Sequence, residues 1–254
     1  MSPRKVPEQQ EPVVARVRLR YAKRGPLRFS SHRDFARAFE RALRRAAIPI
    51  AFSSGFHPHP RVSYMSAAPT GVASEAEYLE VALRRPAAAE DVGTALDDAL
   101  PPGLDIVEAV MAESSGFAER FHASLWRIEL PDVAHDTLSA AVTAFMNSEE
   151  VIVTRLTKKG NRAFDARAAV VNAVVRPVAG DFSASCAILD VVVSQVTPAV
   201  RPDDVLSGLS LVADLELPVP PRVTRLAQGP LTESGDITDP FDADRVRPLV
   251  SADE

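Results

Sequence analysis

With 254 residues, of which 46% are hydrophobic, the chain can bury the core of one large domain or of two small ones. Its longest apolar runs are far shorter than the roughly 20 residues that cross a bilayer, and its charged N-terminus lacks the apolar stretch of a secretion signal. We therefore expect a cytoplasmic protein with no membrane partner. The single cysteine, Cys186, excludes an internal disulfide and any cluster held by several thiolates of one chain.

Charge is distributed unevenly along the chain, although the net charge is only -5. The segment from Arg16 to Arg61 contains twelve Lys or Arg residues against Asp34 and Glu40. The segment from Leu231 to Glu254 contains seven acids against two arginines, and such a composition is typical of disorder. We expect residues 1–12 and 231–254 to be disordered tails.

The first half of the chain, residues 13–112, has the pattern of a βαββαβ domain. Alternating apolar and basic residues predict a strand at 13–21 with arginines on its outer face. Ser30 or Ser31 can then cap a helix whose apolar residues recur at helical spacing. The remaining predicted elements are a second strand formed by 48–52 and 61–67 and interrupted by a turn, a third strand at 78–83, a helix at 87–100 and a fourth strand at 104–111.

The second half, residues 121–228, repeats this order less regularly after a joining segment at 113–120. We predict a helix at 133–146, a short helix opened by Pro202, and strands at 121–130, 151–155, 167–175, 186–194 and 222–226. The predicted fold class is therefore α+β, with two ferredoxin-like βαββαβ halves of which the second is less regular. A single mixed sheet with helices on one face is the alternative.

The first helix has a row of arginines opposite its phenylalanines, formed by Arg33, Arg37, Arg41 and either Arg44 or Arg45. Like charges at this spacing cost a few tenths of a kcal/mol per pair, so an anionic partner would explain the row, whereas the alternative is a solvated face. Neighbouring cations are expected to converge with the row into one RNA-binding surface: Arg20, Lys23, Arg24, Arg28, His32 and Arg61.

The turn GFHPHP holds further candidates for RNA contact. Its prolines stiffen an exposed loop, and Phe56 and His57, together with Tyr64 nearby, are candidates for stacking on bases. The pair His57 and His59 has no third ligand at a suitable spacing, so no metal site is predicted.

A second basic cluster flanks Gly160-Asn161, where a turn is predicted. We interpret it as a hairpin with a cationic, RNA-binding tip, and an ordinary exposed hairpin is the alternative; its candidate residues are Lys158, Lys159, Arg162 and Arg167.

Catalytic signals are sparse. The sequence contains neither a P-loop nor a GxGxxG pattern, and Cys186 opens an apolar strand as a small hydrophobic residue would. His32 beside Ser30 and Ser31 could form an acid/base pair for RNA cleavage, but a histidine in a first helical turn is more often a surface residue. The catalytic residues are unknown, and we do not expect the chain itself to be an enzyme.

Several motifs occur in order along the chain. They are R-Y-x-K-x-G at 20–25, F-S-S-H-x-D at 29–34, G-F-x-P-x-P at 55–60, P-x-G-V-x-S-x-x-E-Y at 69–78 and K-x-G-x-x-x-x-D-x-R at 158–167. By these motifs the chain resembles, over roughly Val14 to Leu206, the radical-SAM-associated family, a group of uncharacterised proteins.

The resemblance implies a role in RNA or ribosome metabolism. Members of that family occur alone or as the C-terminal part of larger radical-SAM polypeptides, often encoded beside an E/G-type ribonuclease and ribosomal protein genes. Radical-SAM chemistry needs a CxxxCxxC site, which a chain with one cysteine lacks, so a separate enzyme would supply the cluster, and no cofactor is expected here. The resemblance thus implies an RNA-binding accessory protein that presents a substrate to a radical-SAM enzyme or RNA-processing factor. A metal-independent endoribonuclease of paired ferredoxin-like domains and a protein-protein scaffold are the alternatives.

Overall fold

The computed structural model describes residues 12–158, 160–177 and 186–245. The chain divides into two compact units: unit 1 contains the residues up to Ala118 and again those from Phe241, and unit 2 is Glu119–Pro240. The boundary between Ala118 and Glu119 lies within the predicted joining segment 113–120. The return of the C-terminal segment to unit 1 was not predicted.

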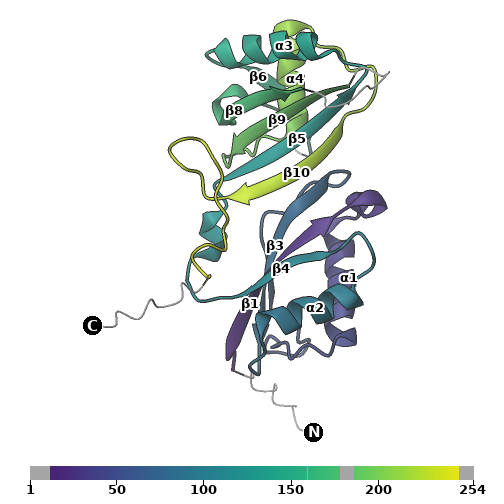
Figure 1. Ribbon diagram of the computed structural model, residues 1–254, viewed down its shortest axis with the longest axis vertical. Helices are drawn as coiled ribbons and strands as arrows, with labels where there is room; N and C mark the ends of the chain where they lie inside the picture. Colours follow the sequence, from purple (N-terminus) through teal and green to yellow (C-terminus); the bar gives the residue numbers. More distant parts are fainter. Residues whose placement is uncertain (1–11, 159, 178–185, 246–254) are drawn as a thin grey trace, which may run out of the picture. The chain divides into compact units, whose positions relative to one another are not determined.

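Unit 1 has the predicted βαββαβ order (Figure 1). Its strands lie in the order β4-β1-β3-β2, and each is antiparallel to its neighbour. Residues 48–52, predicted as a strand, form only isolated bridges at Ile50 and Phe52. The elements of unit 1 are β1 (Ala15–Lys23), the short 3-10 helix η1 (Gly25–Phe29), α1 (His32–Arg45), β2 (Val62–Tyr64), β3 (Ala73–Leu83), α2 (Ala89–Ala99) and β4 (Ile106–Met111).

The core of unit 1 lies between the two helices and one face of the strands. Alternate residues of β1, namely Val17, Leu19 and Tyr21, pack with the apolar faces of α1 and α2. Because side chains of a strand alternate between its two faces, the arginines of β1 lie on the face opposite the helices. Ser31 caps α1 through a hydrogen bond from the Asp34 amide to its hydroxyl (3.2 Å), as predicted.

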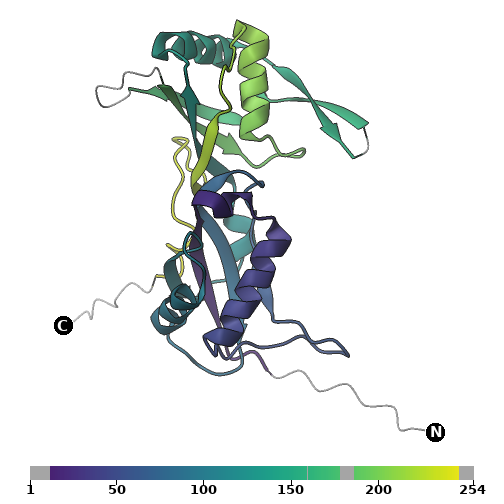
Figure 2. The ribbon, with the colours of Figure 1, turned by 90° about the vertical axis from the view of Figure 1, so that its right-hand side faces the viewer.

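Unit 2 has the same antiparallel order, β10-β5-β9-β8, which corresponds to β4-β1-β3-β2 of unit 1. The equal order supports the ferredoxin-like interpretation of both halves. The irregularity predicted for the second half is an inserted hairpin, β6-β7, between α3 and β8 (Figure 2). The elements of unit 2 are the 3-10 helix η2 (Phe117–Arg120), which spans the boundary, β5 (Ala123–Pro131), α3 (His135–Asn147), β6 (Ile152–Thr157), β7 (Gly160–Asp165), the 3-10 helix η3 (Arg167–Ala169), β8 (Val170–Arg176), β9 (Cys186–Ser194), α4 (Pro202–Ala213) and β10 (Arg222–Gly229).

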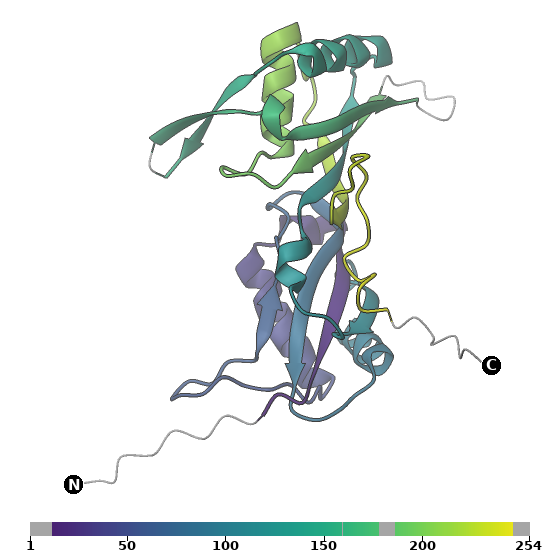
Figure 3. The same cartoon turned by 90° about the vertical axis from the view of Figure 1, so that its left-hand side faces the viewer.

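The prediction that the chain is disordered from Leu231 onward is wrong for residues 231–245. Leu231 bridges Ile237, and the ring of Phe241 is fully buried in unit 1, stacked on Phe117 at 5.7 Å. Figure 3 shows the last part of this yellow segment, which belongs to unit 1, near the purple strand β1. Its acidic composition suggested disorder, but the segment buries an aromatic ring, Phe241, and a carboxylate, Asp244. The rest of both predicted tails, 1–11 and 246–254, lies outside the described residues.

Within the described ranges, no helix combines the length and the hydropathy that are needed to span a membrane.

Candidate nucleic-acid interface

Helix α1 exposes a row of arginines that is only partly offset by Asp34, whose charge interacts with those of Arg33 and Arg37. Arg33, Arg37, Arg41 and Arg44 are exposed, and no described residue makes a hydrogen bond or an ion pair with their side chains. They lie three or four residues apart and so share one side of the helix. Arg45, the other sequence candidate for the row, instead donates a hydrogen bond to the Ala99 carbonyl at 3.0 Å. The row therefore ends in Arg44.

The cations of β1 and of the turn after it are already paired within unit 1. Arg20 lies 3.0 Å from a Glu108 carboxylate oxygen. Lys23 is buried, and its ammonium group donates to the carbonyls of Ala68 (3.4 Å) and Pro69 (3.3 Å).

Arg24 is bound by two acids. Its guanidinium group pairs with the Glu75 carboxylate and, at 2.8 Å, with Asp105. The hydrogen bond that Arg24 donates to Glu75 is the main cause that raises the pKa of Arg24. Lys23 and Arg24 are thus structural cations.

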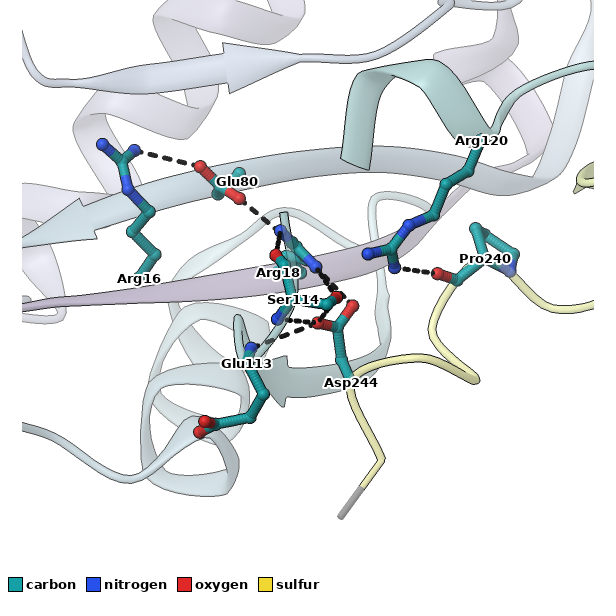
Figure 4. A network of polar contacts seen from close by, with 8 residues as sticks. All are labelled: Arg16, Arg18, Glu80, Glu113, Ser114, Arg120, Pro240 and Asp244. Atoms are coloured by element: carbon teal, nitrogen blue, oxygen red, sulfur yellow. Dashed lines mark hydrogen bonds and ion pairs between the residues drawn. The ribbon is translucent and has the colours of Figure 1, made fainter. Parts of the chain in front are cut away.

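A buried network surrounds Arg18 on the face of the unit 1 strands that lies opposite the helices (Figure 4). The C-terminal segment contributes Asp244 to this network. The Arg18 guanidinium group donates to Glu80 (3.0 Å), to the Ser114 carbonyl (2.6 Å) and to Asp244. The Asp244 carboxylate, fully buried, also accepts hydrogen bonds from the amides of Glu113 (3.1 Å) and Ser114 (3.0 Å). The sequence alone could not identify this acid as the partner of a strand arginine because 226 positions separate the two residues.

The expectation of one converging cationic surface is therefore wrong. The arginines of β1 lie on the face of the strands opposite the helices, where acids neutralise them, and the row of α1 lies on the helical side. Periodicity gave the correct face of each element, but it contains no information on which acids would meet the strand. The candidate interface is reduced to α1 and its immediate neighbours.

Exposed aromatic rings lie in the segments that precede and follow α1 in the chain. Phe29, directly before the capping serines, is 60% exposed, and the guanidinium group of Arg28 lies over its ring at 4.7 Å from the centroid. Sequence reasoning missed Phe29, since a phenylalanine before a helix usually packs against it. Beyond the other end of α1, Phe56 is 73% exposed and His57 is also exposed, as the turn predicted. Arg61, after this turn, is half-buried.

Tyr64 is less suited to stacking than the sequence suggested. It is half-buried, and its ring meets those of His32 (4.9 Å between centroids), Phe35 and Phe39 edge to face. Burial, with a smaller effect of the Glu40 charge, raises the pKa of Tyr64. His32 is exposed at the first position of α1, with one side of its ring on Tyr64.

The second basic cluster lies on the β6-β7 hairpin of unit 2. Gly160 is the first residue of β7, with φ of 107°, so the turn lies one or two residues earlier than predicted. Lys158 and Arg162 are exposed near the tip. Arg167 donates instead to the carbonyls of Met146 (3.2 Å) and Val170 (2.8 Å), in a 3-10 turn that replaces the predicted start of a strand. Lys159 lies outside the described residues.

The described residues provide little for catalysis by the proposed acid/base pair. The Ser31 hydroxyl donates to the Asp34 carboxylate at 2.6 Å and accepts a hydrogen bond from the Asp34 amide as the cap of α1. Both hydrogen bonds give this hydroxyl a structural role. That hydrogen bond is the main cause that lowers the pKa of Asp34. Cys186 is half-buried at the start of β9. No three His, Cys, Asp or Glu side chains of the described part lie close enough together to hold a metal ion.

Residues 16–202 match the model of a family described as "Uncharacterized protein conserved in bacteria (DUF2344)". The chain belongs to this family. The match includes α1, the turn at Phe56 and the β6-β7 hairpin, but not residues 203–245 with Phe241 and Asp244. The family description names no activity, ligand or partner, and it does not mention radical-SAM enzymes. No curated protein matches the chain in a sequence comparison.

Proposed function

We propose that this protein is an RNA-binding accessory protein that uses α1 to hold the RNA backbone and presents the RNA to a separate radical-SAM enzyme or RNA-processing factor. The row Arg33, Arg37, Arg41 and Arg44 carries this proposal, because these exposed side chains make no ion pair or hydrogen bond within the described chain. The charge of Asp34 offsets that of Arg33 and Arg37 only in part. The motifs shared with radical-SAM-associated proteins, some encoded beside E/G-type ribonucleases and ribosomal proteins, support the choice of RNA and of a partner enzyme.

The row has dimensions that suit a nucleic-acid backbone. From Arg33 to Arg44 the helix rises by about 16 Å, at about 1.5 Å per residue, so several successive phosphates can lie along it. The exposed rings of Phe29, just before α1, and of Phe56, in the turn that follows α1 in the chain, are suited to stacking on unpaired bases. The cations of the β6-β7 tip, Lys158 and Arg162, are candidates for a second contact. We propose no chemical step for the chain itself.

Salt dependence of RNA binding tests the proposal. For single-stranded RNA, each phosphate contact contributes about 0.7 to the slope of log affinity against log salt. A variant with Arg33, Arg37 and Arg41 changed to Gln should therefore bind labelled RNA more weakly at low salt, with a slope reduced by about 2 in fluorescence anisotropy titrations.

A matched control removes the same charge from paired arginines. Arg16 pairs with Glu80, Arg24 with Glu75 and Asp105, and Arg222 with Glu129. Their combined change to Gln should leave the slope nearly unchanged. Equal losses in both triple variants would mean that only net charge matters. Wild-type protein that binds no RNA even at low salt would refute the proposal outright.

A further inference from the structure

The outer edge of unit 1 carries a groove between α2 and β4 that is unrelated to the row of α1. A hollow of 430 Å³ lies there, lined on the helix side by Glu90, Thr94 and Asp98 and on the strand side by residues 106–109. This volume is within the range of natural ligand pockets, about 300 to 1,000 Å³. Gly93 brings the helix close to the strand beside the hollow, since a Cβ atom there would lie 2.9 Å from that of Ala109.

The floor of the groove is a strand edge with unpaired backbone groups. Within unit 1, β4 pairs only with β1 among the described strands. The Ala112 amide donates to the Arg16 carbonyl at 3.0 Å, which continues the pairs of Val110 with Arg18 and of Glu108 with Arg20. In an antiparallel ladder the intervening residues point their N–H and C=O groups away from the partner strand. The backbone groups of Ala109 and Met111 therefore face the open edge.

The charge of the groove is negative and only partly compensated. All four ionisable residues that line it are acids, and α2 contains no Lys or Arg. Asp97 accepts a hydrogen bond from the Ile106 amide at 2.6 Å, and Glu108 pairs with Arg20 and Arg245. Glu90 and Asp98 are exposed, and within the described residues neither has an ion-pair or hydrogen-bond partner.

We infer that the groove between α2 and β4 binds an extended, Lys- or Arg-containing segment of a protein partner, which adds to β4 as a further strand. A row of backbone donors and acceptors on a strand edge is recognised by another extended backbone, and the neighbouring pocket selects its side chains. Glu90 and Asp98 would receive the cationic side chains of that segment. The chain would then bind a protein partner through the acidic groove and an anion through α1, and the two ligands would contact different elements of unit 1.

The test titrates the ¹⁵N-labelled full chain with a short peptide of alternating valine and lysine and follows the amide resonances by NMR. Strand addition predicts shifts and slowed hydrogen exchange at the amides of Ala109 and Met111, with further shifts at Thr94 and Asp98. The same peptide with N-methyl groups on alternate residues cannot donate its backbone hydrogen bonds, so it should not bind. Equal binding of the methylated peptide, or shifts confined to other elements, would overturn the inference.

Charge selection is tested with a paired variant and its control. Changing Glu90 to Gln together with Asp98 to Asn should weaken binding of the valine-lysine peptide about tenfold, which corresponds to about 1.4 kcal/mol for two ion pairs. The control changes Asp91 to Asn together with Asp136 to Asn, two exposed acids outside the groove, and should bind as wild type. Equal weakening in both variants, or unchanged binding in both, would contradict the proposed site. The wild-type NMR result decides the strand addition without any variant.

Discussion

The two units have one strand order but use charge differently. In both units, the fourth, first, third and second strands lie side by side in that order, each antiparallel to its neighbour. Two helices follow the first and the third strand of each unit in the chain. Of the four α-helices in the described chain, only α1 of unit 1 contains Lys or Arg. Unit 2 has instead an inserted hairpin. Because the same topology forms without a basic helix, the arginine row is an addition to the fold rather than a requirement of it.

Each unit has a buried carboxylate that pairs with arginine, but the exposure of the arginine differs between the two units. In unit 1, the fully buried carboxylate of Asp244 meets Arg18, whose side chain is only 3% exposed. In unit 2, Asp190 is similarly buried, but its partners Arg127 and Arg176 are 40% and 52% exposed. Arginines that reach water can be rehydrated when their acid is lost, whereas a buried arginine cannot. The cost of removing the acid should therefore differ between the units.

The largest effect is expected from changing Asp244 to Ala. The change removes one charge partner of Arg18 and leaves the amides of Glu113 and Ser114 without their acceptor, so it should lower the free energy of unfolding by about 3 kcal/mol. Urea denaturation followed by circular dichroism measures this loss, since the single tryptophan, Trp126, lies in unit 2.

The neighbouring acid Asp242 provides the control for this prediction. It is exposed, and among the described residues its one ion-pair partner is Arg245, three residues away, so its change to Ala should cost less than about 0.5 kcal/mol. If the two variants unfold at the same urea concentration as wild type, the buried network does not stabilise unit 1.

A second comparison concerns a glycine in the second helix of each unit. A Cβ atom on Gly208 of α4 would lie 2.6 Å from the Phe145 ring, so changing this glycine to Ala should destabilise unit 2 by about 2 kcal/mol through overpacking. On Gly93 of α2 the contact is with a methyl group at 2.9 Å, and the gain in helix propensity, about 1 kcal/mol, offsets most of the strain.

Denaturation midpoints of the two glycine variants test the comparison. Trp126 fluorescence reports the Gly208 variant, and circular dichroism reports the Gly93 variant. A Gly208 variant as stable as wild type would mean that Phe145 can move aside without cost.

The smallest effect is a pH dependence within unit 2. Burial raises the pKa of Asp190, but hydrogen bonds from Arg127 and Arg176 outweigh burial and hold it below the ordinary value of 3.8. In the acid range the unfolded chain therefore binds more protons at this site, and stability is lost as pH falls below 3.8 and through the lowered pKa. The stability advantage of wild type over an Asp190→Asn variant should shrink in that window.

Asp204 of the same unit should behave in the opposite way. Burial raises its pKa, and the Arg201 amide and Arg155 compensate only in part. The folded chain then holds this proton more tightly, so the contribution of Asp204 decreases as pH rises from 3.8 to the raised pKa. Unfolding titrations of Asp190→Asn and Asp204→Asn variants that show the same pH trend would contradict these assignments.

Local sequence patterns were sufficient for most elements. The apolar period and the capping serine predicted α1, and the apolar run from Cys186 to Ser194 predicted β9 with the bounds that the structure has. Both signals depend on residues close in sequence, whose spacing fixes the periodicity. The hairpin turn was displaced because Gly160 can either occupy a turn or begin a strand with positive φ.

The sequence by itself determined the α+β class, the basic face of α1 and the exposed Phe56 turn, because each is indicated by a pattern of residues that are close together in the sequence. Only the tertiary structure decided which cations form ion pairs with acids. Acids from β3, from β4 and from the C-terminal segment meet the arginines of β1, and this pairing depends on strand register and on contacts more than 200 positions apart. Such contacts leave no local signal, so charge counted along the chain overstated the extent of the candidate cationic surface.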